Sequence, residues 1–173
     1  MKKYTRKELI ELLEIVDRQI SYPVQLIIIG GSAAVLKYRV ENATKDIDYI
    51  DDSPSFRHAI EEANLSTKLS VPFEKVTVHD GPYHFTDRIV SADVSNLKNL
   101  KIFYPEIHDL ILMKSIRGNE NDFDMIREIC KKNRIDVSVL KERIDNEMDH
   151  VIGNPERLKL QYEICLEIAE EFS

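Results

Sequence analysis

"IIIGGSAAVLKYRVENATKDIDYI", residues 27–50, is the stretch of the chain that decides the fold. The run from Val24 to Ile29 is apolar except for Gln25, and such a run predicts a buried central strand. Gly30, Gly31 and Ser32 follow, and glycine readily makes the turn that leads into a short helix. Backbone amides at this turn, with the Ser32 hydroxyl, form a natural cradle for phosphate groups. A tight turn without a ligand is the alternative interpretation.

Two aspartates follow on a second predicted strand, residues 46–50. Side chains two residues apart on a strand project from the same face, which places Asp46 beside Asp48. Such close like charges repel each other, and aspartate is depleted in strands. Paired carboxylate oxygens suit Mg²⁺ or Mn²⁺, which leave coordination positions open for substrate phosphates. The pair therefore predicts a metal site, against the alternative of solvated acids on a strand edge. Lys45, beside the pair, is a candidate phosphate contact.

The rest of the chain alternates between helical and strand patterns, without repeats or low-complexity segments. These patterns predict an α/β (α+β) fold, with a mixed sheet of about four to five strands flanked by helices. Helices are expected over 6–20, 32–38, 54–64, 122–132, 136–149 and 155–172 and from residue 105, and further strands over 73–79, 88–94 and 100–103. We expect one compact unit, in which C-terminal helices (134–173) pack on the domain formed by residues 1–133.

The charge of the chain is acidic but uneven, with a net value of −7. Residues 134–173 hold 5 Lys and Arg against 10 Asp and Glu, whereas residues 1–133 hold 19 against 21. A broad DNA-binding surface is therefore not expected, although the nearly neutral first part can hold an anionic substrate. The acidic helices are a candidate surface for a partner protein or a second copy of the chain.

Cysteine usage and apolar runs give no sign of a zinc site or a membrane protein. The two cysteines, Cys130 and Cys165, lie in helical patterns without a CxxC motif, so buried free thiols are expected. The N-terminus lacks the apolar core and the cleavage site of a signal peptide. No run approaches the roughly 18 apolar residues of a membrane span. We therefore expect a cytoplasmic protein.

The two motifs gain specificity when they are taken together. IIIGGS and KDIDYI stand close together, with 13 residues between Ser32 and Asp46. This arrangement resembles the signature of the polymerase-β-like nucleotidyltransferases, a glycine turn followed by Asp-hydrophobic-[Asp/Glu]. HDLILMKSIRGNENDFDMI, residues 108–126, extends the resemblance to small nucleotidyltransferases that include AbiE-type toxins and their stand-alone relatives. The resemblance covers roughly residues 7–133.

This resemblance implies a nucleotidyltransferase-like fold and roles for several residues. Asp46 and Asp48 would hold Mg²⁺. The turn made by Gly30, Gly31 and Ser32 would position the phosphates of an NTP. Lys114 would offset the negative charge of the triphosphate.

A later aspartate, Asp122, would orient Lys114 or the acceptor. The chain departs from the family pattern at Asn121, where a basic residue is common, and at Met125, where an acid is common. The family's third metal-binding carboxylate is not evident from the sequence. Asp80, just after the strand pattern KVTVH, is the first candidate, and Asp93 is the second.

The leading interpretation is a metal-dependent transfer of a nucleoside monophosphate from an NTP to a protein, an RNA such as tRNA, or a small molecule. The family link also implies a toxin–antitoxin context, which is analogy and not a site argument. Two alternatives stay open. One is a nucleotide-binding or regulatory module that has lost turnover, and the other is an interaction protein that acts through its acidic C-terminal helices.

Overall fold

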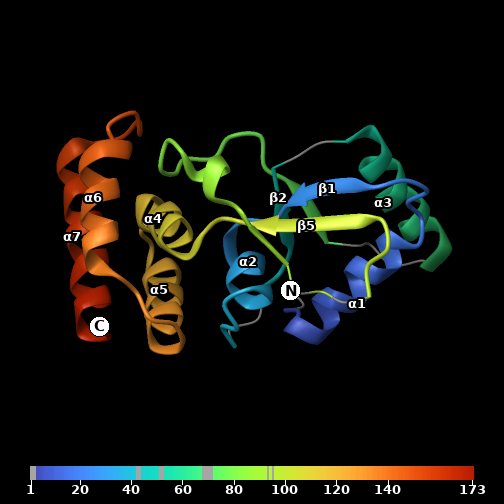
Figure 1. Ribbon diagram of the computed structural model, residues 1–173, viewed down its shortest axis with the longest axis horizontal. Helices are drawn as coiled ribbons and strands as arrows, with labels where there is room; N and C mark the ends of the chain where they lie inside the picture. Colours follow the sequence, from blue (N-terminus) through green and yellow to red (C-terminus); the bar gives the residue numbers. More distant parts are fainter. Residues whose placement is uncertain (1–2, 42–43, 51–52, 68–71, 93, 95) are drawn as a thin grey trace.

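The computed structural model describes residues 3–41, 44–50, 53–67, 72–92, 94 and 96–173. Within them the chain forms a mixed α/β fold, as the sequence predicted, with helices around two small sheets (Figure 1). The helices are α1 (Arg6–Asp17), α2 (Gly30–Leu36), α3 (Pro54–Thr67), α4 (Ile107–Arg117), α5 (Glu120–Lys132), α6 (Val137–Glu147) and α7 (Pro155–Glu171), with a 3₁₀ turn, η1, at Phe85–Arg88. The strands are β1 (Val24–Ile27), β2 (Ile47–Tyr49), β3 (Phe73–Lys75), β4 (Val90–Ser91) and β5 (Leu100–Tyr104). None of the helices in these ranges has both the length and the apolar character needed to cross a membrane.

The strands form two small sheets that meet at the end of β1. In the first sheet, β5 lies between β1, which is parallel to it, and β4, which is antiparallel. The second sheet is the parallel pair β2 and β3. Two backbone hydrogen bonds join the sheets, from Ile29 N to Asp48 O at 2.9 Å and from Ile50 N to Ile27 O at 3.1 Å. The strand that carries Asp48 is thereby fixed beside the turn that follows β1.

Helix α1 closes the core at the N-terminal side. A capping box begins the helix, since Glu8 N donates to Thr5 Oγ1 and Thr5 N donates to Glu8 Oε2. The helix packs against α2 and α3 through fully buried apolar side chains such as Leu13. At its last residue, the buried Asp17 carboxylate accepts three backbone N–H groups from residues 98–100, which anchors the start of β5.

The C-terminal helices form the other end of the molecule (Figure 1). Helix α7 packs against α4, α5 and α6, and α4 and α5 also contact α2. A buried group of charges ties α6 to the rest, because Arg88 bonds both Asp109 on α4 and Glu147 on α6. Arg143 on α6 also donates to Asp109, at 2.7 Å. The division at residue 133 stays a prediction.

Three elements differ from the patterns in the sequence. Helix α2 begins at Gly30, two residues before the predicted start. Strand β3 ends at Lys75 and does not reach residue 79, because its partner β2 ends at Tyr49 and offers no further backbone groups. Val78, which the alternating pattern would place in the strand, lies past its end and is exposed. The region 88–94, predicted as one strand, contains the end of η1 and the two-residue β4.

Candidate metal and nucleotide site

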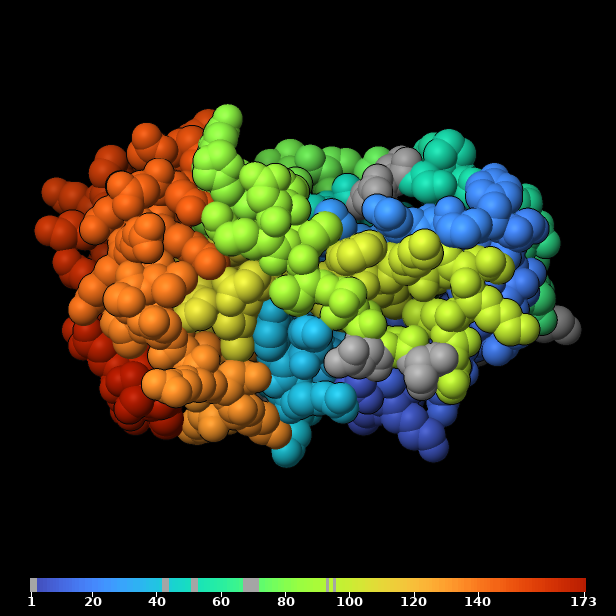
Figure 2. All heavy atoms as spheres, viewed as in Figure 1, coloured from blue at the N-terminus to red at the C-terminus, as the bar shows by residue number. Residues whose placement is uncertain are grey.

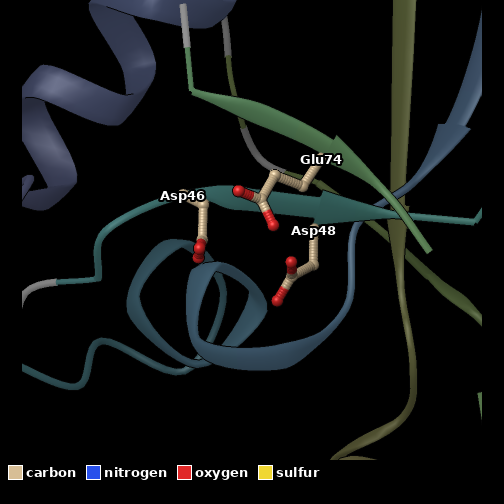
Figure 3. A group of neighbouring side chains, drawn as sticks. All are labelled: Asp46, Asp48 and Glu74. Atoms are coloured by element: carbon tan, nitrogen blue, oxygen red, sulfur yellow. The ribbon is translucent and has the colours of Figure 1, made fainter.

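Three carboxylates meet at the N-terminal end of α2. Asp46, Asp48 and Glu74 each offer one oxygen, and these oxygens all lie within 4.8 Å of one another. Figure 3 shows the three side chains turned to the same side of β2. The parallel pairing explains the third member, since Asp48 lies directly opposite Glu74 in the register of β2 and β3. The strand face that holds the aspartate pair thus gains a glutamate from its neighbour.

The electrostatics of this carboxylate group are unfavourable without a cation. Burial first, and then the charges of Asp46 and Glu74, raise the pKa of Asp48 to about 6, although Arg117 and Lys114 act in the opposite direction. None of the described lysines and arginines forms an ion pair with the three carboxylates. The site therefore holds concentrated negative charge that a divalent cation can offset.

Gly30 lets the backbone approach Asp48 closely. It has a φ of +65°, and a Cβ atom there would lie 2.5 Å from Asp48 Oδ2. Any other residue would meet both the strain of the left-handed region and this contact. The glycine turn therefore does two things: it starts α2 and leaves room for the carboxylate.

A groove of about 620 Å³ opens beside the carboxylates. The first side of the groove consists of Gly31, Thr44, Lys45 and the three acids. The opposite side comes from α4 and α5 and includes Lys114, Arg117 and Asp122. The groove is also lined by Asn121 and Met125, the two positions at which the chain departs from the family pattern.

The basic side of the groove is built around one buried carboxylate. Asp122 is 1% exposed and binds Arg117 through two hydrogen bonds, from Nε at 2.6 Å and from Nη2 at 2.5 Å. Lys114 Nζ lies 3.7 Å from the same carboxylate, and this side chain is only 5% exposed. Burial lowers the pKa of Lys114, while Asp122 acts to raise it. Asp122 thus holds two cations at the groove.

Local structure brings these groups together. Gly118, with a φ of +54°, ends α4 in the left-handed conformation that glycine favours. Asn119 then caps α5 by accepting from Asp122 N at 3.0 Å. The tight connection places the last turn of α4 beside the first turn of α5. Asp122 itself is the third residue of the helix and not its cap.

Some of the predicted residues lie elsewhere. Ser32 is fully buried, and its hydroxyl donates to Ile29 O within α2 at 2.9 Å, so it does not line the groove. Gly30 lies behind Asp48 and is not part of the groove wall.

The third carboxylate of this group is Glu74, and Asp80, which the sequence favoured for that place, is not among the three. Asp80 is exposed. Burial of Tyr162 on α7, and then the charge of Asp80, raise the pKa of Tyr162 to about 12. The second candidate, Asp93, lies outside the described residues. Arg117 was also missed, although its place three residues after Lys114 puts both on one side of a helix.

A family model described as "Nucleotidyltransferase of unknown function (DUF6036)" matches residues 7–168. The chain belongs to this nucleotidyltransferase family. The match includes both sides of the groove and extends beyond residue 133, so the C-terminal helices are part of the family pattern. Searches of curated proteins and of solved structures gave no significant match.

Proposed function

We propose that this nucleotidyltransferase moves a nucleoside monophosphate from an NTP to an acceptor and releases pyrophosphate, in a reaction that depends on Mg²⁺ or Mn²⁺. The observation that carries the proposal is the groove, in which three carboxylates face a lysine and an arginine. Its volume of about 620 Å³ lies in the usual range for small-ligand sites, which is roughly 300–1,000 Å³. Family membership supports the same class of reaction.

The three carboxylates fit a hard divalent cation. Their donor atoms are all oxygens, they lie close together, and neighbouring charge and burial raise the pKa of Asp48 to about 6. We propose Asp46, Asp48 and Glu74 as the ligands. A bound cation would neutralise charge on the triphosphate and favour attack at the α-phosphorus.

The residues of the opposite side would hold the substrate. Lys114 and Arg117 supply positive charge for the phosphates, and both are positioned by Asp122. Lys45 and the backbone of Gly31 would contact the phosphates from the first side. Positioning and charge stabilisation of this kind are the main catalytic contributions that phosphoryl transfer requires.

Glu74 favours an enzyme over a regulatory module without turnover. A site with only two carboxylates would favour a module that binds a nucleotide without turnover. Glu74 adds a third carboxylate beside Asp46 and Asp48. We further propose the relationship to polymerase-β-like and AbiE-type enzymes, on the glycine turn and the aspartate pair. RNA, protein and small molecules remain candidate acceptors, and a toxin–antitoxin context remains an analogy.

Label transfer tests the proposal. The protein is incubated with each α-labelled NTP, with Mg²⁺ or Mn²⁺, and with total tRNA or cell lysate as the acceptor. Asp48→Asn removes a proposed metal ligand, and Asp80→Asn is the matched control outside the carboxylate group. We expect label on one acceptor class with wild type and Asp80→Asn, but not with Asp48→Asn. A lack of both transfer and metal-dependent NTP binding in wild type would contradict the assignment.

A further inference from the structure

A second, smaller cavity lies at the opposite end of α2. It measures about 200 Å³ and is lined by Arg6, Leu36, Lys37, Arg39, Val94 and Tyr104. Helix α2 has seven residues, so its two ends lie roughly 10 Å apart. Figure 2 shows the α2 region, in cyan, between the C-terminal helices and the sheet on one face of the molecule. None of the lining residues belongs to the metal and nucleotide groove.

Three cations surround this cavity, and the ion pairs of the described residues include none of them. Arg6 Nε donates to Leu36 O at 3.1 Å, and Lys37 Nζ donates to Ser91 O at 2.8 Å. Arg39 makes no hydrogen bond to any described residue. Burial, and then the charge of Arg39, lower the pKa of Arg6. Unpaired cations close together in a chain of net charge −7 point to a missing anion.

A buried hydroxyl provides an independent sign of a ligand. Tyr104 is 1% exposed, and its hydroxyl has no hydrogen-bond partner among the described residues. Leaving a buried polar group unpaired costs about 1–3 kcal/mol, so native structures rarely do so. Burial raises the pKa of Tyr104, which keeps the O–H available as a donor. The charge of Arg6 acts on the same phenol, so the two donors are neighbours.

We propose that this cavity binds a phosphate-type anion through Arg6, Lys37, Arg39 and the Tyr104 hydroxyl. All four are donors, and guanidinium forks match the oxygen geometry of phosphate. The cavity is smaller than the usual range for larger organic ligands, which suits one phosphoryl group or pyrophosphate. The carbonyl of Leu36 lies at the negative end of α2, which would repel an anion. This carbonyl already accepts a hydrogen bond from Arg6. The anion can be free phosphate or pyrophosphate, or the terminal phosphate of a polynucleotide.

Calorimetry on metal-free protein in EDTA tests this site separately from the groove. The probes are phosphate, pyrophosphate and a short oligonucleotide with and without a 5′-phosphate. Tyr104→Phe removes only the hydroxyl, and Arg39→Gly removes a guanidinium at a φ of +60° that glycine adopts without strain. Lys7→Gln is the charge-matched control, because Lys7 is 88% exposed and does not line the cavity. Arg117→Met controls for binding at the groove, because it removes a cation that lines the groove and does not line the cavity.

We expect wild type to bind at least one probe that carries phosphate. Affinity should fall about tenfold or more in Tyr104→Phe and in Arg39→Gly, and by less than about twofold in Lys7→Gln and Arg117→Met. Melting curves without anion should show that Tyr104→Phe is at least as stable as wild type, since the hydroxyl has no protein partner. Preference for the 5′-phosphorylated oligonucleotide would assign the anion to a polynucleotide, and preference for pyrophosphate would assign a free anion.

Three results would overturn the proposal. One is no binding of any probe by wild type. Another is equal affinity in wild type and Tyr104→Phe, because the hydroxyl distinguishes a built site from surface charge. The third is an equal loss in Lys7→Gln and Arg39→Gly. The proposed transfer reaction is unaffected by all three, since the assay contains no metal and no NTP.

Discussion

Two acidic groups of the chain, one around Asp109 and one around Asp48, differ in how their charge is offset. Asp109 on α4 is fully buried, but Arg88 binds it through two hydrogen bonds of 3.0 and 2.9 Å and Arg143 adds a third. Asp48 is half-buried, and its nearest charged neighbours are the carboxylates of Asp46 and Glu74. The first group is complete within the protein, whereas the second lacks its counter-charge.

We infer from this difference that one group is structural and that the other belongs to the proposed active site. Arginines neutralise the acids that join η1, α4 and α6, so that network stabilises the fold and needs no ligand. The carboxylate group at α2 lowers stability and gains from a cation, which is typical of active sites. Substitutions should therefore affect folding in one group and binding in the other.

The largest effect is expected from Arg88→Met, which keeps an apolar side chain but removes the guanidinium. Asp109 and Glu147 would lose their main partner, and breaking a buried ion pair costs about 3–5 kcal/mol. Urea unfolding measures the free energy of unfolding. Lys141→Met removes an exposed pair with Glu170 and should cost less than about 1 kcal/mol. Similar losses in the two variants would show that the network around Asp109 contributes no more to the free energy of unfolding than an exposed ion pair does.

Glu74→Gln should act on the reaction and leave the fold intact. Its side chain is exposed, so substitution should change the free energy of unfolding by less than about 0.5 kcal/mol. Removing one ligand from a charge-stabilising site should lower the rate of label transfer about 100-fold. Single-turnover kinetics beside Asp80→Asn would measure the effect. Equal rates in both variants would exclude Glu74 from the site.

Arg117→Lys tests the basic side of the groove. Lysine keeps the charge but cannot make the two parallel hydrogen bonds to Asp122. We expect a loss of NTP affinity of about tenfold, because Lys114 and Asp122 lose a positioned neighbour. Competition binding with NTP and metal measures this. Unchanged affinity would show that Arg117 serves only to neutralise Asp122.

The smallest effect is a gain in stability in Asp48→Asn without metal. The pKa of Asp48 is about 6 in the folded chain, against roughly 3.9 in an unfolded one, so its charge destabilises the fold above pH 6. With allowance for solvent screening, the variant should be about 1 kcal/mol more stable than wild type at pH 7.5 in EDTA. The gain should shrink as the pH falls from 6 toward 4, because wild type then binds its proton. A gain that does not depend on pH would contradict this explanation.

Sequence predicted the parts of the site that are local in the chain. The glycine turn and the same-face placement of Asp46 and Asp48 follow from patterns within residues 24–50, and the α/β class follows from the helix and strand patterns along the chain. Lys114 and Asp122 came from the family resemblance, and both lie in the groove.

The parts that depend on tertiary pairing were missed. Glu74 reaches the aspartates through the register between β2 and β3, which strand patterns do not specify. The choice of Asp80 assumed a strand that continued to residue 79, but β3 loses its partner at Lys75. The cavity at the far end of α2 combines side chains from residues 6 to 104, so no local motif marks it.

Calorimetric titration of Mn²⁺ in the presence of a non-hydrolysable NTP analogue tests the metal site most directly. Wild type and Asp80→Asn should bind the ion with equal affinity, and Asp48→Asn and Glu74→Gln should bind it at least about tenfold more weakly. Binding that is equal in all four proteins, or absent in wild type, would contradict the assignment of Asp46, Asp48 and Glu74 as the metal ligands.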